Sequence, residues 1–246
     1  MIRPITNMQE EITLSFGQNL QYLRRMRRGM TQEALAEKLQ VTRQTVSKWE
    51  MGDAFPEMDK AVALSRLFAC SLDDLLLREL GADDDACTCL RVERVPGFRY
   101  VRYTVISADP ENDALRHVQR LAETLGIPEP QVIGWDFPFV SQEQTNVYHM
   151  HGYTAALLLP QQHDGAALPV ESQPQADYAA LTIRDPFAAP FTRIPNGYRT
   201  LTRYLEMNGL TARTRGVLPC FERTFAKDGV TCMDVFIAVE GSGPER

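Results

Sequence analysis

Apolar residues recur at helical spacing from Phe16 to Leu77, and no stretch in this region alternates in the way that indicates a strand. The first predicted helix carries Phe16, Leu20 and Leu23 on one side and ends before Gly29. Four shorter helices are expected to follow, with predicted N-caps for three of them at Thr31, Thr42 and Ser71. The pattern predicts an all-α bundle over the first third of the chain.

The pattern changes after residue 90, where strands are expected to surround two helices. Helical spacing of apolar residues predicts one helix at 110–125 and another at about 196–208, each stopped by a glycine. The predicted strands cover residues 91–95, 98–105, 132–140, 147–159, 178–184, 217–225 and 230–240. The order strand, helix, strand, strand therefore occurs twice, which indicates an α+β domain built of two such repeats.

An acidic run of small residues, Gly-Ala-Asp-Asp-Asp-Ala, begins at Gly81 and separates the two patterns. Such a run is typical of a solvated spacer. The predicted organisation is a helical domain at 1–78, a linker at 79–89 and an α+β domain at 90–246.

The charges are divided unevenly between these parts. Residues 1–80 hold 11 basic and 11 acidic side chains, whereas residues 81–246 hold 15 and 21, which accounts for the net charge of −6. Residues 15–52 contain seven basic and three acidic side chains, so their net charge is +4. Phosphates respond to the surface that faces them, so the helical part favours nucleic acid as a partner and the remainder does not.

The composition further restricts the class of protein and the compartment in which it is expected. A hydrophobic content of 44% is that of a globular protein, and the sequence offers neither a membrane-spanning run nor a secretory signal, so a cytoplasmic protein is expected. Five cysteines are an odd number and predict reduced thiols. Cys87 and Cys89 lack nearby partners for a tetrahedral metal site. We expect no metal and no cofactor.

The segment TQEALAEKLQVTRQTVSKWEMG, residues 31–52, resembles the Xre/phage-repressor family of helix-turn-helix proteins, and the resemblance extends over about 15–77. The matching positions are Thr31-Gln32, Ala36, Val41, the Trp49-Glu50-x-Gly52 closure of the third helix, and Pro56. The resemblance implies a lambda-repressor-like bundle whose third helix, beginning at Thr42, lies in the major groove of duplex DNA. Val46 and Trp49 are expected to be buried behind that helix.

On this resemblance the DNA-contacting residues are Gln32, Thr42, Arg43, Gln44, Thr45 and Lys48. Arg43 has the forked end that pairs with guanine and Gln44 the amide that pairs with adenine, while Gln32 would contact a phosphate or support Gln44. Arg24, Arg25, Arg27 and Arg28 are candidate phosphate contacts. Because one such domain makes few contacts, a homodimer on paired half-sites is expected.

Residues 90–240 resemble the GyrI-like domain, which also serves AraC-type regulators as an effector-binding domain. The matching segments are Val217-Leu-Pro-Cys-Phe-Glu222 and Asp234-Val-Phe-Ile-Ala-Val-Glu240, although Thr224 and Ala238 depart from the family pattern. The resemblance implies a groove between the two repeats that binds small aromatic or cationic compounds.

Trp135, Phe137, Tyr153 and Glu222 are the candidate ligand contacts. Trp135 and Phe137 alternate onto one strand face, which either lines the groove or forms the core. Glu222 shares a face with Leu218 and Cys220, where a carboxylate needs a partner: a cationic ligand, or an arginine such as Arg203. His149, His151 and Tyr153 share another face, where groove or surface residues are favoured over metal ligands.

These observations favour a DNA-binding transcriptional regulator whose second domain senses a small molecule, with no membrane association. Two alternatives remain at this point. The second domain binds a protein partner, or it hydrolyses a small compound with Glu222 as base. No Ser/His/Asp or Cys/His grouping supports catalysis, so we expect no enzymatic activity and no catalytic residue.

Overall fold

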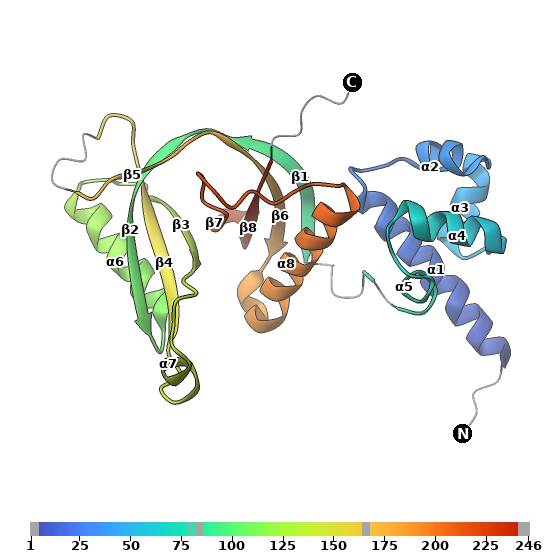
Figure 1. Ribbon diagram of the computed structural model, residues 1–246, viewed down its shortest axis with the longest axis horizontal. Coiled ribbons are helices and arrows are strands. Elements are labelled where there is room, and N and C mark those ends of the chain that lie inside the picture. Colours follow the sequence, from blue (N-terminus) through green and yellow to red (C-terminus); the bar gives the residue numbers. More distant parts are fainter. Residues whose placement is uncertain (1–4, 79, 82–85, 164–167, 241–246) are drawn as a thin grey trace. The chain divides into compact units, whose positions relative to one another are not determined.

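The computed structural model describes residues 5–78, 80–81, 86–163 and 168–240 (Figure 1). The contacts divide the chain into two compact units, one of residues 1–91 with 189–211 and the other of residues 92–188 with 212–246. The first unit is helical and the second carries most of a β-sheet, so the predicted fold class is confirmed. No helix among the described residues is both long and apolar enough to cross a membrane.

The helical unit begins with the predicted bundle. Its helices are α1 (Ile5–Met26), α2 (Gln32–Leu39), α3 (Arg43–Met51), α4 (Met58–Leu67) and α5 (Leu72–Leu77). The hydroxyls of Thr31 and Thr42 accept hydrogen bonds from backbone amides and cap α2 and α3, as the sequence predicted. Gln40, with φ of 55°, ends α2 in the left-handed conformation and starts the short turn into α3.

The bundle core explains why α1 and α3 lie so close together. Phe16, Leu20, Val46 and Trp49 are buried with 0–4% of their surface exposed. A Cβ at Gly17 would lie 2.6 Å from the carbonyl oxygen of Trp49, so α1 approaches the backbone of α3 at a position where only glycine fits. The apolar side of α3 is therefore fixed against α1, and the side that carries Arg43 and Gln44 is exposed.

Helix α8 (Pro190–Met207) also belongs to the helical unit, although its position in the sequence predicted it as part of the α+β domain. The Nδ2 atom of Asn208, at its end, donates a hydrogen bond of 3.1 Å to the carbonyl of Met26 at the end of α1. A cavity of about 180 Å³ lies among residues of α1, α5, α8 and the segment 68–70 that follows α4. Its lining includes Leu23, Phe68, Cys70, Arg203 and Met207.

The sheet has the strand order β1-β6-β8-β7-β3-β4-β2-β5. Its strands are β1 (Cys87–Val95), β2 (Phe98–Ser107), β3 (Gln131–Asp136), β4 (His151–Leu159), β5 (Glu171–Gln173), β6 (Ala176–Arg184), β7 (Cys220–Lys227) and β8 (Val230–Val239). The remaining elements are α6 (Pro110–Thr124), α7 (Gln142–Asn146) and the 3₁₀-helix η1 (Pro186–Ala188). The first strand begins four residues before its predicted start, inside the segment expected to be a linker; residues 79 and 82–85 of that segment lie outside the described ones.

The predicted duplication is confirmed by the strand order. The element order β2-α6-β3-β4 returns as β6-α8-β7-β8, and each set places its last strand between the other two. The two sets meet where β3 pairs with β7, at Gly134 opposite Glu222. Each outer strand, β1 and β5, pairs with the first strand of the other set.

The two faces of the sheet carry separate cores in the first repeat. On one face α6 packs through Ala114, Val118 and Ala122 against β2 and β4. On the other face Tyr100 and Ile133 join Tyr178, Phe221 and Phe236 of the second repeat in a second cluster. The side chains that alternate along β3 therefore point into different surroundings.

Candidate functional site

The exposed side of α3 carries the side chains that the sequence predicted to contact DNA. Arg43, Gln44 and Lys48 are exposed, and Gln44 and Lys48 are neighbours one helical turn apart. The hydroxyls of Thr42 and Thr45 lie 2.8 Å apart at the start of this helix. The structure thus brings these five residues together on one surface, with nothing apolar among them.

Gln32 stands at the first position of α2 and is held by an ion pair inside the bundle. Its Nε2 atom donates a hydrogen bond of 2.9 Å to Glu50. Glu50, whose side chain is 2% exposed, also receives two hydrogen bonds of 2.6 and 3.0 Å from the guanidinium of Arg24. This network sets the orientation of the Gln32 amide beside the start of α3.

The arginines of α1 divide into two kinds, which the sequence did not separate. Arg24 is bound to Glu50 and to the carbonyl of Met30, and its side chain is only 12% exposed. Arg27 donates a hydrogen bond to the carbonyl of Leu67 in α4. Both therefore serve packing within the bundle, whereas Arg25 and Arg28 are exposed.

The sheet unit contains a pocket of about 410 Å³ where the two repeats meet. Helix α6, strands β3, β4, β7 and β8, and η1 all contribute to its wall. The lining residues are Glu111, Asn112, Leu115, Val132, Ile133, Gly134, Tyr153, Phe187, Glu222, Thr224 and Met233. Two carboxylates, a phenol, an amide and a hydroxyl thus lie among the apolar residues of this wall, and none of its residues is a lysine, arginine or histidine.

Tyr153 is the most buried polar side chain of this wall, with 8% of its surface exposed. Its hydroxyl lies directly over Gly134, since a Cβ at that position would be 2.0 Å from the oxygen. Burial raises the pKa of Tyr153 well above its ordinary value, and the charges of Glu222, Glu111 and Asp136 raise it further. The phenol therefore stays protonated and is a hydrogen-bond donor.

The carboxylates around Tyr153 are themselves partly desolvated. Burial raises the pKa of Glu111, and the nearby charges of Asp136 and Asp109 add to the effect. Burial also raises the pKa of Asp136, at the end of β3, against the opposing influence of His151. Burial therefore disfavours the charged forms of Glu111 and Asp136 near the Tyr153 hydroxyl.

The four residues predicted to bind a ligand do not lie together. Tyr153 and Glu222 both line the pocket. Trp135 packs against the core cluster on the other face, with its ring 6.3 Å from that of Tyr100 in an edge-on arrangement. Phe137 lies beyond the end of β3, where its ring contacts Phe139 at 5.4 Å.

The sequence analysis did not identify Glu111, Asp136 or Gly134 as residues in or beside this pocket. Glu111 reaches the pocket from the first turn of α6, and Asp136 comes from the strand face opposite Trp135. The alternation along β3 places Gly134 and Asp136 on the face opposite Trp135. It does not indicate which of the two faces is left partly uncovered by helix α6.

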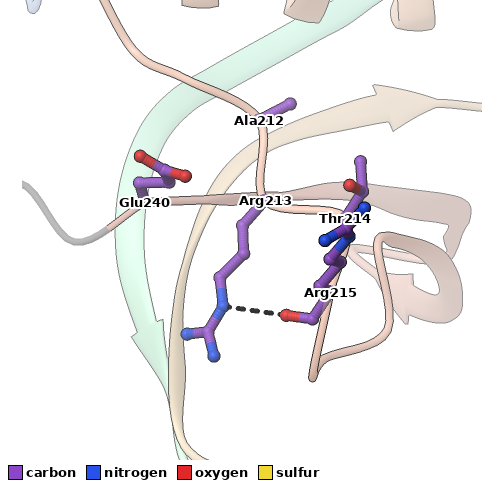
Figure 2. Close-up of a pocket in the computed structure, with 5 residues that line it drawn as sticks. All are labelled: Ala212, Arg213, Thr214, Arg215 and Glu240. Carbon is purple, nitrogen blue, oxygen red and sulfur yellow. Dashed lines mark hydrogen bonds between the residues drawn. The ribbon is translucent and has the colours of Figure 1, made fainter.

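A second hollow lies at the end of the sheet and is more open. It has a volume of about 530 Å³ and is lined by Ala212, Arg213, Thr214, Arg215 and Glu240 (Figure 2). The Nε atom of Arg213 donates a hydrogen bond of 3.2 Å to the carbonyl of Arg215 in the same loop. The loop is tied to β8 by the amide of Arg213, which bonds to the carbonyl of Ala238 at 2.8 Å. These bonds hold the loop against the end of β8.

Comparison with known proteins finds a family match within the helical bundle. Residues 20–75 match the family described as Helix-turn-helix. The HTH-type transcriptional activator BcrR of Enterococcus faecalis is 41% identical over 66 residues, which are 27% of this chain and 32% of that protein. The chain thus spans about a third of the length of this relative.

Solved structures resemble the chain over a longer range but more distantly. The EcmrR–DNA complex has a TM-score of 0.46 at 11% identity and covers 85% of this chain and 81% of its own. SAV2435 bound to tetraphenylphosphonium has a TM-score of 0.38 at 10% identity and covers 63% and 95%. At TM-scores below 0.5 neither resemblance assigns a ligand or a partner to this chain.

Proposed function

We propose that this chain, whose residues 20–75 belong to the helix-turn-helix family, is a DNA-binding transcriptional regulator. Helix α3 enters the major groove, where Arg43 reads a guanine and Gln44 an adenine. Thr42, Thr45 and Lys48 complete the contact from the same surface. The observation that carries this proposal is the polar, exposed side of a helix whose other side is fixed by Val46 and Trp49.

Gln32 positions the chain on the DNA backbone next to this helix. Its amide is oriented by Glu50, which is itself held by Arg24. A side chain fixed before binding loses less conformational entropy when it meets a phosphate. Two copies of the chain bind paired half-sites, because a single domain buries too little surface for tight and specific recognition.

The pocket between the repeats holds a small effector that is aromatic or cationic. Its volume of about 410 Å³ lies in the range of small-molecule sites, and its apolar wall carries a few polar groups that can fix a ligand. Tyr153 and Glu222 are the predicted contacts that lie in it. An effector that binds one state of the regulator more tightly than another shifts its affinity for DNA. In this proposal Glu222 binds the effector and has no catalytic role.

Selection of bound duplexes from a random pool, with the full chain, tests the DNA-binding proposal. A recurring paired motif is expected, with an affinity that falls as salt rises. Arg43→Ala should relax preference at one base pair of each half-site, whereas Arg25→Ala should weaken binding evenly. Absence of salt-sensitive affinity for any duplex would refute the proposal.

A thermal-shift screen of aromatic cations tests the effector proposal. Compounds that bind the pocket should raise the unfolding temperature of the protein, and this stabilisation should be lost in Glu222→Gln. A compound that stabilises both proteins equally binds elsewhere.

A further inference from the structure

The chain between β3 and β4, residues 138–151, leaves the sheet as an ordered segment. Figure 1 shows its helix α7 beyond the ends of these two strands. The amide of Phe137 bonds to the carbonyl of Gly152 at 2.9 Å and closes the base of the segment. Ser141 and Gln144 exchange two hydrogen bonds of 3.1 and 2.9 Å, which form a capping box at the start of α7. These bonds fix the backbone of this β3–β4 segment, whereas most of its side chains are exposed.

The exposed side chains of the β3–β4 segment include three large apolar ones. Phe139, Val147 and Tyr148 have 79%, 62% and 56% of their surface exposed. None of the three belongs to either core cluster of the sheet described above. Apolar surface that is concentrated in this way on a soluble protein is typical of an interaction site.

The charge of the β3–β4 segment indicates what kind of partner it binds. Its only formal charge is that of Glu143, and it contains no lysine or arginine with which to meet a phosphate. The chain as a whole has a net charge of −6, so two copies repel one another. A contact through this segment adds only the repulsion between two Glu143 carboxylates, and it removes apolar surface from water. The charge therefore favours a second copy of the chain over nucleic acid at this position.

The exposed apolar area is what a small dimer interface needs. An aromatic side chain carries about 150–250 Å², so the three side chains together present on the order of 350 Å² per copy at their exposed fractions. Two copies contribute about 700 Å², and apolar atoms supply about 60% of a typical interface. The whole contact is then about 1,200 Å², which is the lower limit for specific interfaces.

The helical unit exposes another apolar segment, but its charges disfavour self-association. Met51 and Met58 are 59% and 70% exposed. Asp53 and Glu57 lie between them in the sequence, and both are exposed. Two copies that met there would bring four carboxylates together, and like charges at a contact are unfavourable. The β3–β4 segment is therefore the better surface for contact between two copies.

We propose that two copies of the chain associate symmetrically through the β3–β4 segment, with Phe139 and Tyr148 of each copy buried against the other. Because the same surface serves both copies, every apolar side chain of the segment is buried twice in the dimer. This inference rests on the proposed function, in which two copies bind paired half-sites, and it assigns their contact to the sheet unit.

Sedimentation velocity of the full chain over a concentration series tests the inference. The natural chain should pass from monomer to dimer with a dissociation constant on the order of 10 μM, since contacts of this area are weak. Phe139→Gln and Tyr148→Gln should each raise this constant at least about tenfold, because aromatic residues dominate the energy of small interfaces. The matched control is Phe191→Gln, which removes a 95% exposed ring from the start of α8 and should leave the constant unchanged.

Amide hydrogen exchange locates the contact independently. In the natural chain, exchange in α7 should become slower as the protein concentration rises through the range of dimerisation, and in Tyr148→Gln it should not. Circular dichroism of each variant confirms that the fold is retained, as expected for substitutions of exposed side chains.

A natural chain that stays monomeric over the whole concentration series would overturn the inference, and so would a dimer that neither Phe139→Gln nor Tyr148→Gln weakens. Loss of affinity for a single half-site in Tyr148→Gln would show that the segment contacts DNA, which would also overturn it. A chain that dimerises through this segment but binds no duplex would support the inference and refute the DNA-binding proposal alone.

Discussion

Gly134 has no side chain, and this leaves room for Tyr153 in the wall of the pocket. The Tyr153 hydroxyl occupies the place where a Cβ would project from β3, and Glu222 lies opposite Gly134 on the neighbouring strand. A glycine inside a strand weakens it, so its presence at a sheet junction marks a close approach by another group. Here that group is a phenol.

Gly134→Ala is therefore expected to displace Tyr153. The new methyl would lie 2.0 Å from the hydroxyl oxygen, and the ring behind that oxygen is held by burial. Overpacking of this kind costs about 1–3 kcal/mol in the free energy of unfolding, measured by urea denaturation. Affinity for an aromatic cation found in the thermal-shift screen should also fall by about tenfold or more, measured by calorimetry. Unchanged stability together with unchanged affinity would show that Tyr153 is not confined at this position.

The ion pair of Arg24 with Glu50 provides a second prediction for a single residue. Arg24→Met leaves a carboxylate that is only 2% exposed without its cation, so the free energy of unfolding should fall by about 3 kcal/mol. Arg25→Met is the matched control, since that neighbour is exposed and its loss should change stability by less than about 0.5 kcal/mol. Urea denaturation of the two variants measures the difference. Equal stability would show that Glu50 is satisfied without Arg24.

Single residues were predictable from the sequence where a local rule applied. Thr31 and Thr42 cap their helices as the pattern indicated, and Val46 and Trp49 are buried. The surroundings of Trp135 were not predictable, because alternation along a strand assigns residues to two faces without identifying what covers either one.

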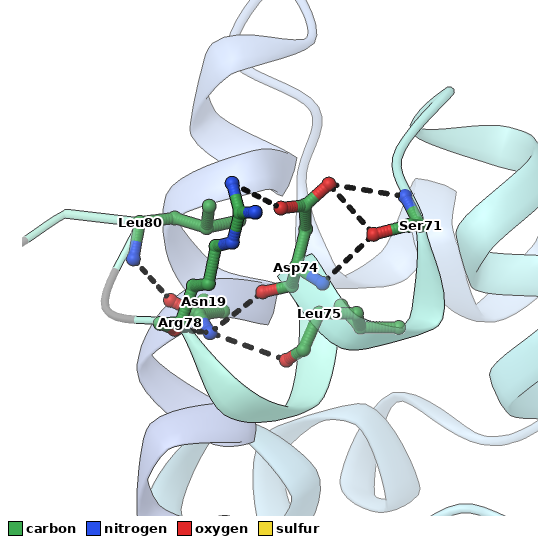
Figure 3. A network of polar contacts seen from close by, with 6 residues as sticks. All are labelled: Asn19, Ser71, Asp74, Leu75, Arg78 and Leu80. Atoms are coloured by element: carbon green, nitrogen blue, oxygen red, sulfur yellow. Dashed lines mark hydrogen bonds and ion pairs between the residues drawn. The ribbon is translucent and has the colours of Figure 1, made fainter.

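At the scale of elements, helix α5 depends on a side chain from α1 (Figure 3). Asn19, which is 1% exposed, donates from Nδ2 to the carbonyls of Asp74 at 3.3 Å, Leu75 at 3.2 Å and Arg78. Its Oδ1 atom accepts a hydrogen bond of 2.9 Å from the amide of Leu80. One buried amide thus satisfies backbone groups at the end of a helix that has only six residues.

Asn19→Leu is expected to loosen α5. The substitution has a similar size but leaves the carbonyls at the end of α5 without their donor, at a cost of about 1–3 kcal/mol in stability. Amide hydrogen exchange should increase in α5 more than in α2. Gln18→Leu, at an exposed position of the same helix, is the control and should leave exchange unchanged. If amide exchange in α5 were equally fast in Asn19→Leu and Gln18→Leu, Asn19 would have no specific role in stabilising α5.

The limits of element prediction have identifiable causes. The strand predicted to reach Val140 ends at Asp136, because Pro138 cannot donate a hydrogen bond to a ladder and Ser141 caps α7. Helix α8 was expected to begin at Asn196, after Pro195, but it begins at Pro190. Pro195 has no N–H group to donate to the carbonyl of Phe191, four residues earlier in the helix. Phe191 is 95% exposed, so water can bond to that carbonyl instead.

At the scale of the whole molecule, the duplication was predictable from the order of the elements, whereas the membership of α8 was not. The sequence places this helix between β6 and β7, yet its contacts group it with the helix-turn-helix bundle. Grouping depends on which side chains meet after folding, and in this case on Asn208, Arg203 and Met207. No periodicity in the chain specifies such a partner.

The path of the chain through α8 gives the last prediction, which rests on the proposed function. Phe187 lines the effector pocket, α8 starts three residues later, and Asn208 at its end bonds to the carbonyl of Met26. Effector binding should therefore change DNA affinity, and by linkage DNA must change effector affinity by the same factor. Anisotropy with labelled DNA and calorimetry with an aromatic cation found in the thermal-shift screen measure the two factors independently.

Asn208→Ala should bring both factors closer to one and leave effector affinity without DNA nearly unchanged, because the residue lies outside the pocket. The control, Thr202→Ala, removes an exposed hydroxyl from the same helix and should preserve the coupling. Full coupling in Asn208→Ala would show that the hydrogen bond to Met26 does not carry the effect. Unequal factors in the natural chain would show that the DNA and effector measurements report different binding events, since reciprocity is a thermodynamic requirement for a single pair of linked sites.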